Sequence, residues 1–226
     1  MADNQLSDTV NRLKAALQAE SATARMNTAM AAGLRPHDAY IDVLVERCAV
    51  EPDFFVRDML TWALIQHDHT LTLERVLPEL NSEIPQARAQ ALHTLSKLGD
   101  QRAWPAITTE LLTDSDDQVA LTAWRAAAAL APDGEAATLA EVLATQFGRG
   151  DRATQRGLSR ALAALGDAAA PAIERATSDR RATVRTHALA TEQLVADPAV
   201  GFDVALDAAR RTAALHGAPL VEHVKE

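Results

Sequence analysis

The chain has 226 residues, a formal net charge of −9 at pH 7 and a mean hydropathy of −0.10. Helix-forming residues dominate the composition, whereas the aromatic residues that strands favour make up only 4%. This balance predicts an all-α fold. An acidic chain repels phosphate backbones and anionic lipid headgroups, which argues against general binding of nucleic acids or membrane surfaces.

Three features of the sequence predict a cytoplasmic location. No stretch of about eighteen apolar residues occurs, so no transmembrane helix is expected. The amino terminus has neither the basic region nor the apolar run of a signal peptide. Cys48 is the only cysteine, so the chain cannot form an internal disulfide.

The first 35 residues predict a helical hairpin. An amphipathic segment runs from Leu6 to Leu17, and a second helix begins near Ala24-Arg25-Met26. Its apolar pattern is weaker than that of the segments that follow. We therefore expect residues 1–35 to form an N-terminal capping hairpin.

A pattern of apolar steps of three and four then recurs five times between residues 36 and 198. Each copy has the same anchor position, and the anchors are separated by 31, 32, 35 and 30 residues; they are Arg57, Arg88, Ala120, Gln155 and Arg185. A second apolar-periodic segment precedes each anchor, which predicts a pair of helices per copy. With the capping hairpin, about six helical hairpins are expected.

Helix-breaking residues separate the copies. Breaks are predicted near Gly99, Pro132, Gly166 and Pro198, where glycine or proline ends one helix and a neighbouring aspartate can cap the next. Residues 199–226 are expected to form a C-terminal capping helix and tail. The whole chain, 1–226, is thus predicted to be a single repeat domain.

These repeats resemble HEAT repeats over about residues 36 to 198. Pro105 and Pro171 lie in the first helix of a repeat, where HEAT repeats often carry proline. An acidic residue lies six positions before the anchor arginine in Glu51/Arg57 and Asp179/Arg185, similar to the Asp and Arg that join HEAT units, although Asp114 lies six before an alanine, Ala120.

The segments around Arg25-Met26 and Val56-Arg57 are also similar to small actinobacterial HEAT-repeat proteins. The resemblance implies a right-handed α-α superhelix, a HEAT-like solenoid, whose second helices line a concave surface. It implies no particular activity.

The chain lacks the common catalytic and metal-binding motifs. Gly-x-Ser-x-Gly, His-Glu-x-x-His, a phosphate-binding glycine loop and paired Cys-x-x-Cys are all absent. His67-Asp68-His69 can be interpreted as part of a metal site or as a solvated turn, and the turn is favoured because metal sites need three or four convergent ligands. No catalytic residue, metal or cofactor is expected, and Cys48 is interpreted as a small buried hydrophobe.

One position of the second helices predicts a binding surface. Residues five after the anchors should form a row on the concave face of the array, namely Trp62, His93, Arg125 and Arg160. A tryptophan in this row has solvent or a ligand as its neighbour. The alternative is that its ring packs sideways on an adjacent helix.

Arginines cluster in the fourth repeat. Arg152, Arg156 and Arg160 recur every four residues and share one helix face. Between positions 149 and 185 the chain has eight arginines and four carboxylates, which reverses the sign of its overall charge. The stripe is either a partner-binding patch, since guanidinium groups pair with carboxylates and phosphates, or only a solvated face.

The sequence therefore predicts a non-catalytic scaffold or adaptor that binds a segment of another protein in its concave groove. Trp62 would anchor that segment, and the arginines would pair with acidic side chains. The alternative is a HEAT-like DNA glycosylase of the bacterial alkylpurine type, since Trp62, Asp58 and the arginine stripe loosely resemble its groove. The net charge of −9 argues against this alternative.

Overall fold

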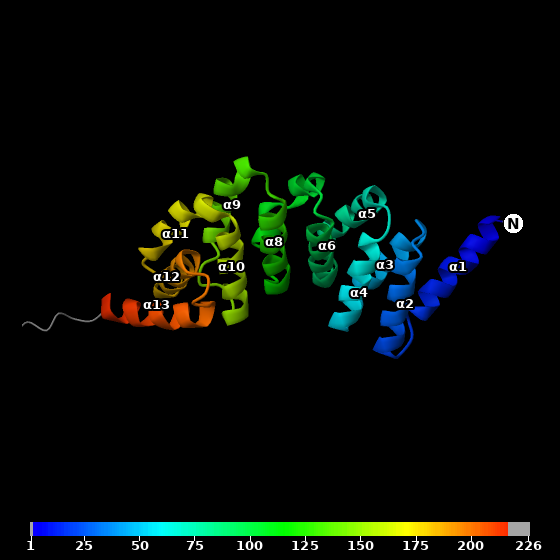
Figure 1. Cartoon of the computed structure of the whole chain (residues 1–226), viewed down its shortest axis with the longest axis horizontal. Helices are drawn as coiled ribbons and strands as arrows, with labels where there is room; N and C mark the ends of the chain where they lie inside the picture. The colour runs from blue at the N-terminus through cyan, green and yellow to red at the C-terminus, as the bar shows by residue number, and fades with distance from the viewer. Residues whose placement is uncertain (1, 217–226) are drawn as a thin grey trace, which may run out of the picture. The chain divides into compact units, whose positions relative to one another are not determined.

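The computed structural model describes residues 2–216 of the chain, and the side chains of residues 7–212 (Figure 1). Every regular element in this part of the chain is a helix, so the predicted all-α fold is confirmed. None of its helices is both long enough and apolar enough to cross a membrane. The last ten residues of the predicted tail, 217–226, lie outside the described residues.

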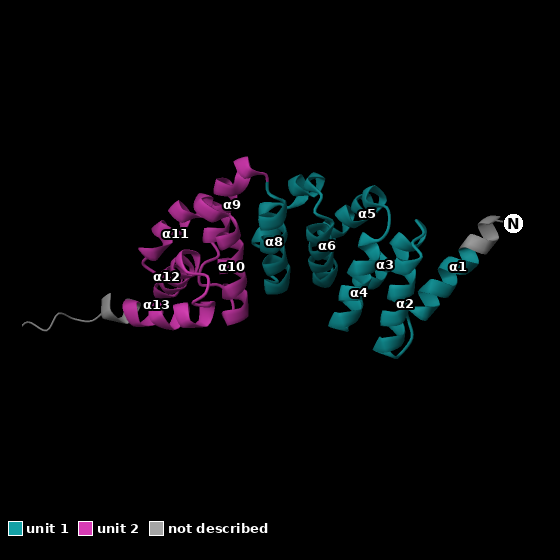
Figure 2. Ribbon diagram, in the orientation of Figure 1, with its two compact units in different colours: residues 1–131 teal, residues 132–226 magenta. Residues whose placement is uncertain are grey.

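The chain divides into two compact units, residues 1–131 and 132–226, which are coloured separately in Figure 2. The α-helices of unit 1 are α1 Ala2–Ala16, α2 Ala22–Leu34, α3 Tyr40–Cys48, α4 Phe54–Ile65, α5 His69–Val76, α6 Pro85–Leu98, α7 Thr109–Leu112 and α8 Asp117–Leu130. Two 3-10 helices lie among them, η1 Leu77–Asn81 and η2 Gln101–Ala106.

Unit 2 continues the same alternation of shorter and longer helices. Its α-helices are α9 Ala136–Ala144, α10 Arg152–Ala164, α11 Ala170–Thr177, α12 Ala182–Ala196 and α13 Phe202–His216, and its 3-10 helices are η3 Asp133–Glu135 and η4 Gly166–Ala169. The predicted C-terminal capping helix corresponds to α13.

The helices form consecutive hairpins within each unit. In the described part of the chain, α2, α4, α6, α8, α10 and α12 are the second helices of six hairpins, which is the arrangement of a HEAT-like solenoid and confirms the predicted repeat. In unit 1, α2 packs on α4, α4 on α6 and α6 on α8; in unit 2, α10 packs on α12 and α12 on α13.

Local sequence sets the ends of the helices. Asp53, Asp116 and Asp151 accept backbone N–H groups as N-caps of α4, α8 and α10. Gly99 ends α6 with a φ of 67°, and Gly166 follows α10 with a φ of 58°. The expected breaks at Pro132 and Pro198 also fall between helices.

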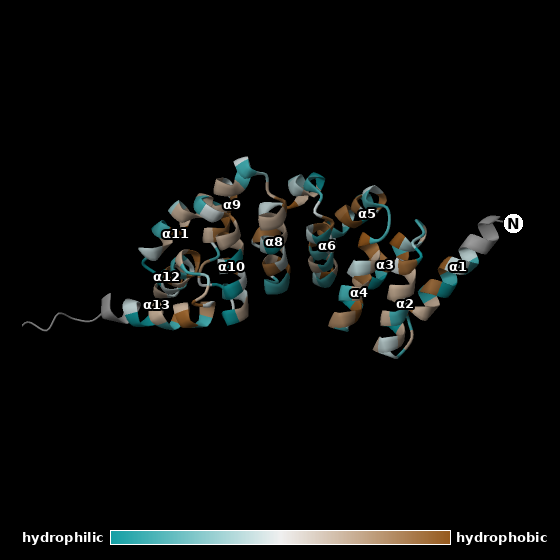
Figure 3. Cartoon of the chain, in the orientation of Figure 1, coloured by the Kyte–Doolittle hydropathy of each residue, from teal (hydrophilic) through white to brown (hydrophobic). Residues whose placement is uncertain are grey.

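Many hydrophobic residues of the helices, whose positions are brown in Figure 3, have buried side chains. Leu95 and Leu162 are fully buried. Trp124 is also fully buried, and its indole Nε1 donates to the carbonyl oxygen of Leu112 over 2.8 Å. Trp104 is only half-buried.

The anchor arginines, together with Arg25 of the first hairpin, share one contact. Each donates from Nη1 to the backbone carbonyl oxygen six residues earlier, at distances of 2.8 to 2.9 Å; the arginines are Arg25, Arg57, Arg88 and Arg185. This contact lies within one hairpin, between the second helix and the segment that precedes it.

Two carboxylates of unit 1, Glu51 and Asp114, pair with an arginine of the preceding hairpin, 26 residues earlier, and so join successive repeats. Glu51 is completely buried and accepts from Arg25 at 2.8 Å, from Arg47 and from the backbone N–H of Asp53. Asp114 accepts from Arg88 in the same way. These hydrogen bonds hold the pKa of Glu51 at about 2, against the opposing effect of its burial.

In unit 2 the buried contact between α10 and α12 is made by uncharged groups. His187 is buried, and its Nδ1 accepts the N–H of Gly148 at 3.0 Å, so its proton lies on Nε2, close to the Gln155 carbonyl and the Ser159 hydroxyl. Ser159 also contacts Thr191 at 2.7 Å. Burial lowers the pKa of His187 to about 4.

Candidate functional site

Three second helices of unit 1, α4, α6 and α8, border a hollow of about 390 Å³. Most of the residues that line it carry polar side chains, and they are Phe54, Arg57, Asp58, Ala89, Gln90, His93, Gln118, Thr122 and Arg125. A hollow of this size accommodates a small molecule or a few side chains.

His93 and Asp58 face each other in this hollow. The distance from His93 Nε2 to Asp58 Oδ1 is 3.7 Å, and the His93 side chain is 34% exposed. Desolvation lowers the pKa of His93, with a further contribution from Lys97, and nearby Asp58 opposes this shift only in part. The imidazole is therefore neutral at pH 7 and offers one donor and one acceptor.

Positive charge collects around the hollow although the chain as a whole is acidic. Arg57 and Arg125 line it, and Lys97 and Arg125 both act on the pKa of His93 from close by. The carboxylate of Asp58 is the one acidic group among the lining residues. The hollow therefore presents a net positive charge on a chain with a net charge of −9.

Hydrogen bonds within unit 1 fix the walls of the hollow. Arg57 donates to the carbonyl oxygens of Glu51 and Pro52, which holds its guanidinium group beside the start of α4. Gln90 Nε2 donates to the Thr61 hydroxyl at 3.0 Å. Because these side chains are already positioned, less conformational entropy is lost when a ligand binds.

An aromatic residue forms the rim of the hollow. Phe54 is 65% exposed and packs edge to face on Phe55, which is 71% exposed. The guanidinium carbon of Arg57 lies 5.9 Å from the centre of the Phe54 ring. An exposed apolar rim beside cationic groups gives the hollow a surface for the hydrocarbon part of a ligand.

The hollow contains two of the predicted binding residues, His93 and Arg125. Trp62 is not among its lining residues. Its ring packs against α2 at Gly33, where an added Cβ atom would lie only 2.5 Å from Trp62 Cζ3. The structure thus shows the sideways packing that we considered as the alternative for Trp62.

Most of the other lining residues were not predicted from the sequence. Gln90 and Thr122 lie two residues after the anchors Arg88 and Ala120, so a polar residue at this repeat position is a signal that could have been used. Arg57 was identified only as an anchor, although its side chain lines the hollow as well.

The three predicted arginines of unit 2 lie on α10 but differ in their surroundings. Arg152 is half-exposed and lies 3.7 Å from Asp203 and 3.6 Å from Asp207, both on α13. Arg156 is half-buried near the N-cap Asp151, whose pKa it helps to lower. Arg160 is exposed and lines a separate hollow of unit 2.

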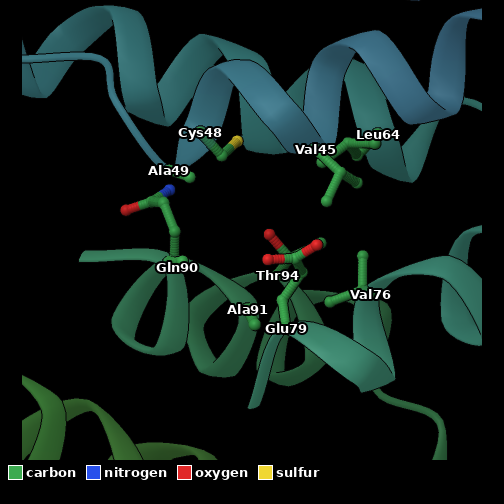
Figure 4. A pocket seen from close by; sticks show the side chains of 10 residues that line it. Val45, Cys48, Ala49, Leu64, Val76, Glu79, Gln90, Ala91 and Thr94 are labelled. Atoms are coloured by element: carbon green, nitrogen blue, oxygen red, sulfur yellow. The ribbon is translucent and has the colours of Figure 1, made fainter. Parts of the chain in front are cut away.

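No group of three His, Cys, Asp or Glu side chains within the described residues is placed to bind a metal ion. His67 is buried and its Nδ1 contacts the Ala63 carbonyl. Cys48 is buried beside a cavity of about 10 Å³, which is at most large enough for a water molecule (Figure 4). Burial raises its pKa to about 12, so it is an unreactive thiol.

The sequence matches no known protein family and no curated protein. Solved structures with similar helical folds include two that cover nearly all of this chain. An engineered protein is 20% identical, with 91% of this chain and 97% of that chain covered and a TM-score of 0.44. Human deoxyhypusine hydroxylase, solved with glycerol, is 14% identical, with 95% and 99% covered and a TM-score of 0.45.

The second of these structures corrects a prediction. Deoxyhypusine hydroxylase is an enzyme, so a fold of helical hairpins is no ground for excluding catalysis. The predictions of a non-catalytic scaffold and of a chain that is not an enzyme are therefore withdrawn. At this degree of likeness, no hydroxylase activity is transferred to the chain.

The alternative interpretation as a DNA glycosylase is not retained either. It required Trp62 and Asp58 to act on one substrate. Instead, the Trp62 ring lies against Gly33, and Asp58 faces His93.

Proposed function

We propose that the chain binds a carboxylate-bearing ligand in the hollow between α4, α6 and α8. The observation that carries this proposal is the convergence of Arg57, Arg125 and His93 on one hollow of an otherwise acidic chain. Guanidinium groups pair with carboxylates through two parallel hydrogen bonds, and such charge-assisted bonds are about twice as strong as neutral ones.

The polar lining favours a ligand with two acidic groups or with one acidic group and further hydrogen-bonding atoms. Gln118 and Thr122 add an amide and a hydroxyl on α8, opposite the side chains of α4. Asp58 repels an acid at one edge, so the carboxylate is expected on the side of Arg125.

The carboxylate can come from a free small molecule or from an Asp or Glu side chain of another protein. The predicted partner, another protein with an acidic segment, is thus one source of the same chemistry. Succinate and a Glu-containing peptide represent the two sources, and succinamide and the matching Gln peptide are their uncharged controls.

Isothermal titration calorimetry of the full chain with these four compounds tests the proposal. We expect succinate or the Glu peptide to bind, with the uncharged control at least about tenfold weaker, which corresponds to about 1.4 kcal/mol. Arg125→Gln should weaken binding by a similar factor. Arg180→Gln, which removes an exposed arginine of unit 2, should leave it unchanged.

The titration also has a predicted pH dependence. Because the pKa of His93 is lowered, the imidazole gains its proton only below its ordinary value of 6.5. Affinity for the acidic ligand should therefore increase as the pH falls below 6.5, and His93→Gln should abolish this increase. Equal binding of the charged and uncharged compounds would contradict the proposed site.

We also infer that the chain belongs among HEAT-like repeat proteins similar to the small actinobacterial ones. The recurring arginine contact to the carbonyl oxygen six residues earlier supports this inference, since it is made at the same position of the repeat each time. A cytoplasmic location remains part of the proposal, supported by the single cysteine.

A further inference from the structure

A second hollow, of about 300 Å³, lies within unit 2. It is formed by the C-terminal half of α10 and by the segment that joins α12 to α13. Its lining residues are mostly apolar and are Arg160, Ala163, Leu194, Val195, Pro198, Gly201 and Phe202. This composition differs from that of the polar hollow in unit 1.

The apolar wall of this hollow is held in place by the core of unit 2. Phe202 is only 5% exposed and belongs to the cluster that joins α12 to α13, where Leu194 packs against it. The Phe202 ring lies edge to face on the buried His187 ring, with 5.8 Å between the ring centres. A ligand would therefore meet a preformed surface rather than one it has to order.

Arg160 gives the hollow its charge. It is the only charged residue among the described residues that line the hollow, and its side chain is exposed at the rim. Asp197 lies close in sequence, but its carboxylate accepts the N–H of Ala199 and is turned into its own loop. Val195, another lining residue, is 37% exposed, so part of its aliphatic surface is accessible to a ligand.

We propose that this hollow is a second binding site, which takes an amphipathic monocarboxylate with a hydrocarbon chain of medium length. The hydrocarbon would cover Leu194, Val195 and Phe202, and the carboxylate would pair with Arg160. Burial of the chain is worth about 0.8 kcal/mol for each CH₂ group removed from water. The guanidinium then selects an acid over an amide of the same length.

Octanoate is the probe, and acetate and octanamide are its matched controls. Acetate keeps the charge without the chain, whereas octanamide keeps the chain without the charge. Calorimetric titration of the full protein should show that octanoate binds at least about tenfold more tightly than either control, a difference of about 1.4 kcal/mol. The site requires both parts of the ligand, so both controls must bind more weakly.

Two variants place the binding in this hollow. Arg160→Gln should weaken octanoate binding at least about tenfold, and Val195→Asp should weaken it further by placing a negative charge on the apolar edge. Both residues are exposed, so the thermal midpoint should change little. Arg180→Gln, which changes an exposed arginine elsewhere in unit 2, is the control and should bind octanoate as the original chain does.

This site is independent of the one proposed for unit 1, and the experiment separates them. Arg125→Gln should leave octanoate binding unchanged, and Arg160→Gln should leave succinate binding unchanged. Octanoate binding that survives both Arg160→Gln and Val195→Asp, or that octanamide equals, would overturn the proposed site.

Discussion

Two junctions between repeats of unit 1 contain an arginine–carboxylate pair, whereas the buried contact of α10 with α12 in unit 2 is made by uncharged groups. In unit 1 the buried carboxylate of Glu51 accepts from Arg25 and Arg47, whereas in unit 2 the buried imidazole of His187 is uncharged and hydrogen-bonds to a backbone N–H. Both arrangements satisfy buried polar groups, as a folded chain requires. They differ in the pH at which the buried group binds a proton, so the free energy of unfolding should depend on pH differently for each.

The largest effect is expected for Glu51→Gln in unit 1. The substitution removes the negative charge that two buried or half-buried arginines share, so the free energy of unfolding should fall by about 3 to 5 kcal/mol. Urea unfolding at pH 7 is the measurement. Glu46→Gln is the matched control, because Glu46 pairs with Lys14 at the surface, and it should cost less than about 1 kcal/mol.

Because of His187, the free energy of unfolding should depend on pH in a higher range than the one in which Glu51 acts. The unfolded chain binds a proton at His187 near pH 6.5, but the folded chain does so only near pH 4. The free energy of unfolding should therefore fall by about 2 kcal/mol between pH 7 and pH 5. His187→Gln should remove this part of the dependence.

The charged junction of unit 1 acts at lower pH. Because the pKa of Glu51 is lowered from 4.5 to about 2, its stabilisation is present above pH 4.5 and is lost as the pH falls toward 2. Urea unfolding of the original chain should be compared at pH 7 and pH 5. If the free energy of unfolding were the same at both, the two junctions would not differ in the pH range in which they act.

A smaller effect is expected where α2 and α4 approach closely in unit 1. In Gly33→Ala the added methyl group would lie 2.5 Å from Trp62 Cζ3 and 2.9 Å from the Ala63 Cα atom, so backbone must move. We expect a loss of about 1 to 3 kcal/mol despite the better helix propensity of alanine. Gly134→Ala, whose methyl group meets no atom within 4 Å, should change stability by less than about 0.5 kcal/mol.

The smallest effect is expected for Arg152→Gln in unit 2. Its ion pairs with Asp203 and Asp207 are long and about half-exposed, so they should contribute less than about 1 kcal/mol to the free energy of unfolding. That contribution should disappear in urea unfolding at high salt. A loss as large as that of Glu51→Gln would mean that surface charge, not the buried junctions, stabilises the chain.

The sequence predicted the helices well because their signals are local. Apolar steps of three and four, a glycine at the end of a helix and an aspartate before the next one depend only on neighbouring residues, as Asp116 and Gly99 show. The partner of a carboxylate was harder to predict. Glu51 lies six residues before Arg57, but it pairs with Arg25 of the preceding hairpin.

The candidate site was predicted only in part, for a related physical reason. His93 and Arg125 were identified from their shared repeat position, and both line the hollow. Trp62 has the same repeat position, but its ring packs on α2 because Gly33 leaves room there. The size of the residue on the neighbouring helix decided the outcome, and a pattern within one helix does not contain it.

The arginine contact to the carbonyl six residues earlier also limits how the chain can change in length. The contact spans the same number of residues at Arg25, Arg57, Arg88 and Arg185, although the anchors themselves are 30 to 35 residues apart. An insertion between the carbonyl and its arginine would break the contact. Insertions and deletions should therefore be tolerated only outside these six-residue spans, in the loops and first helices of the repeats.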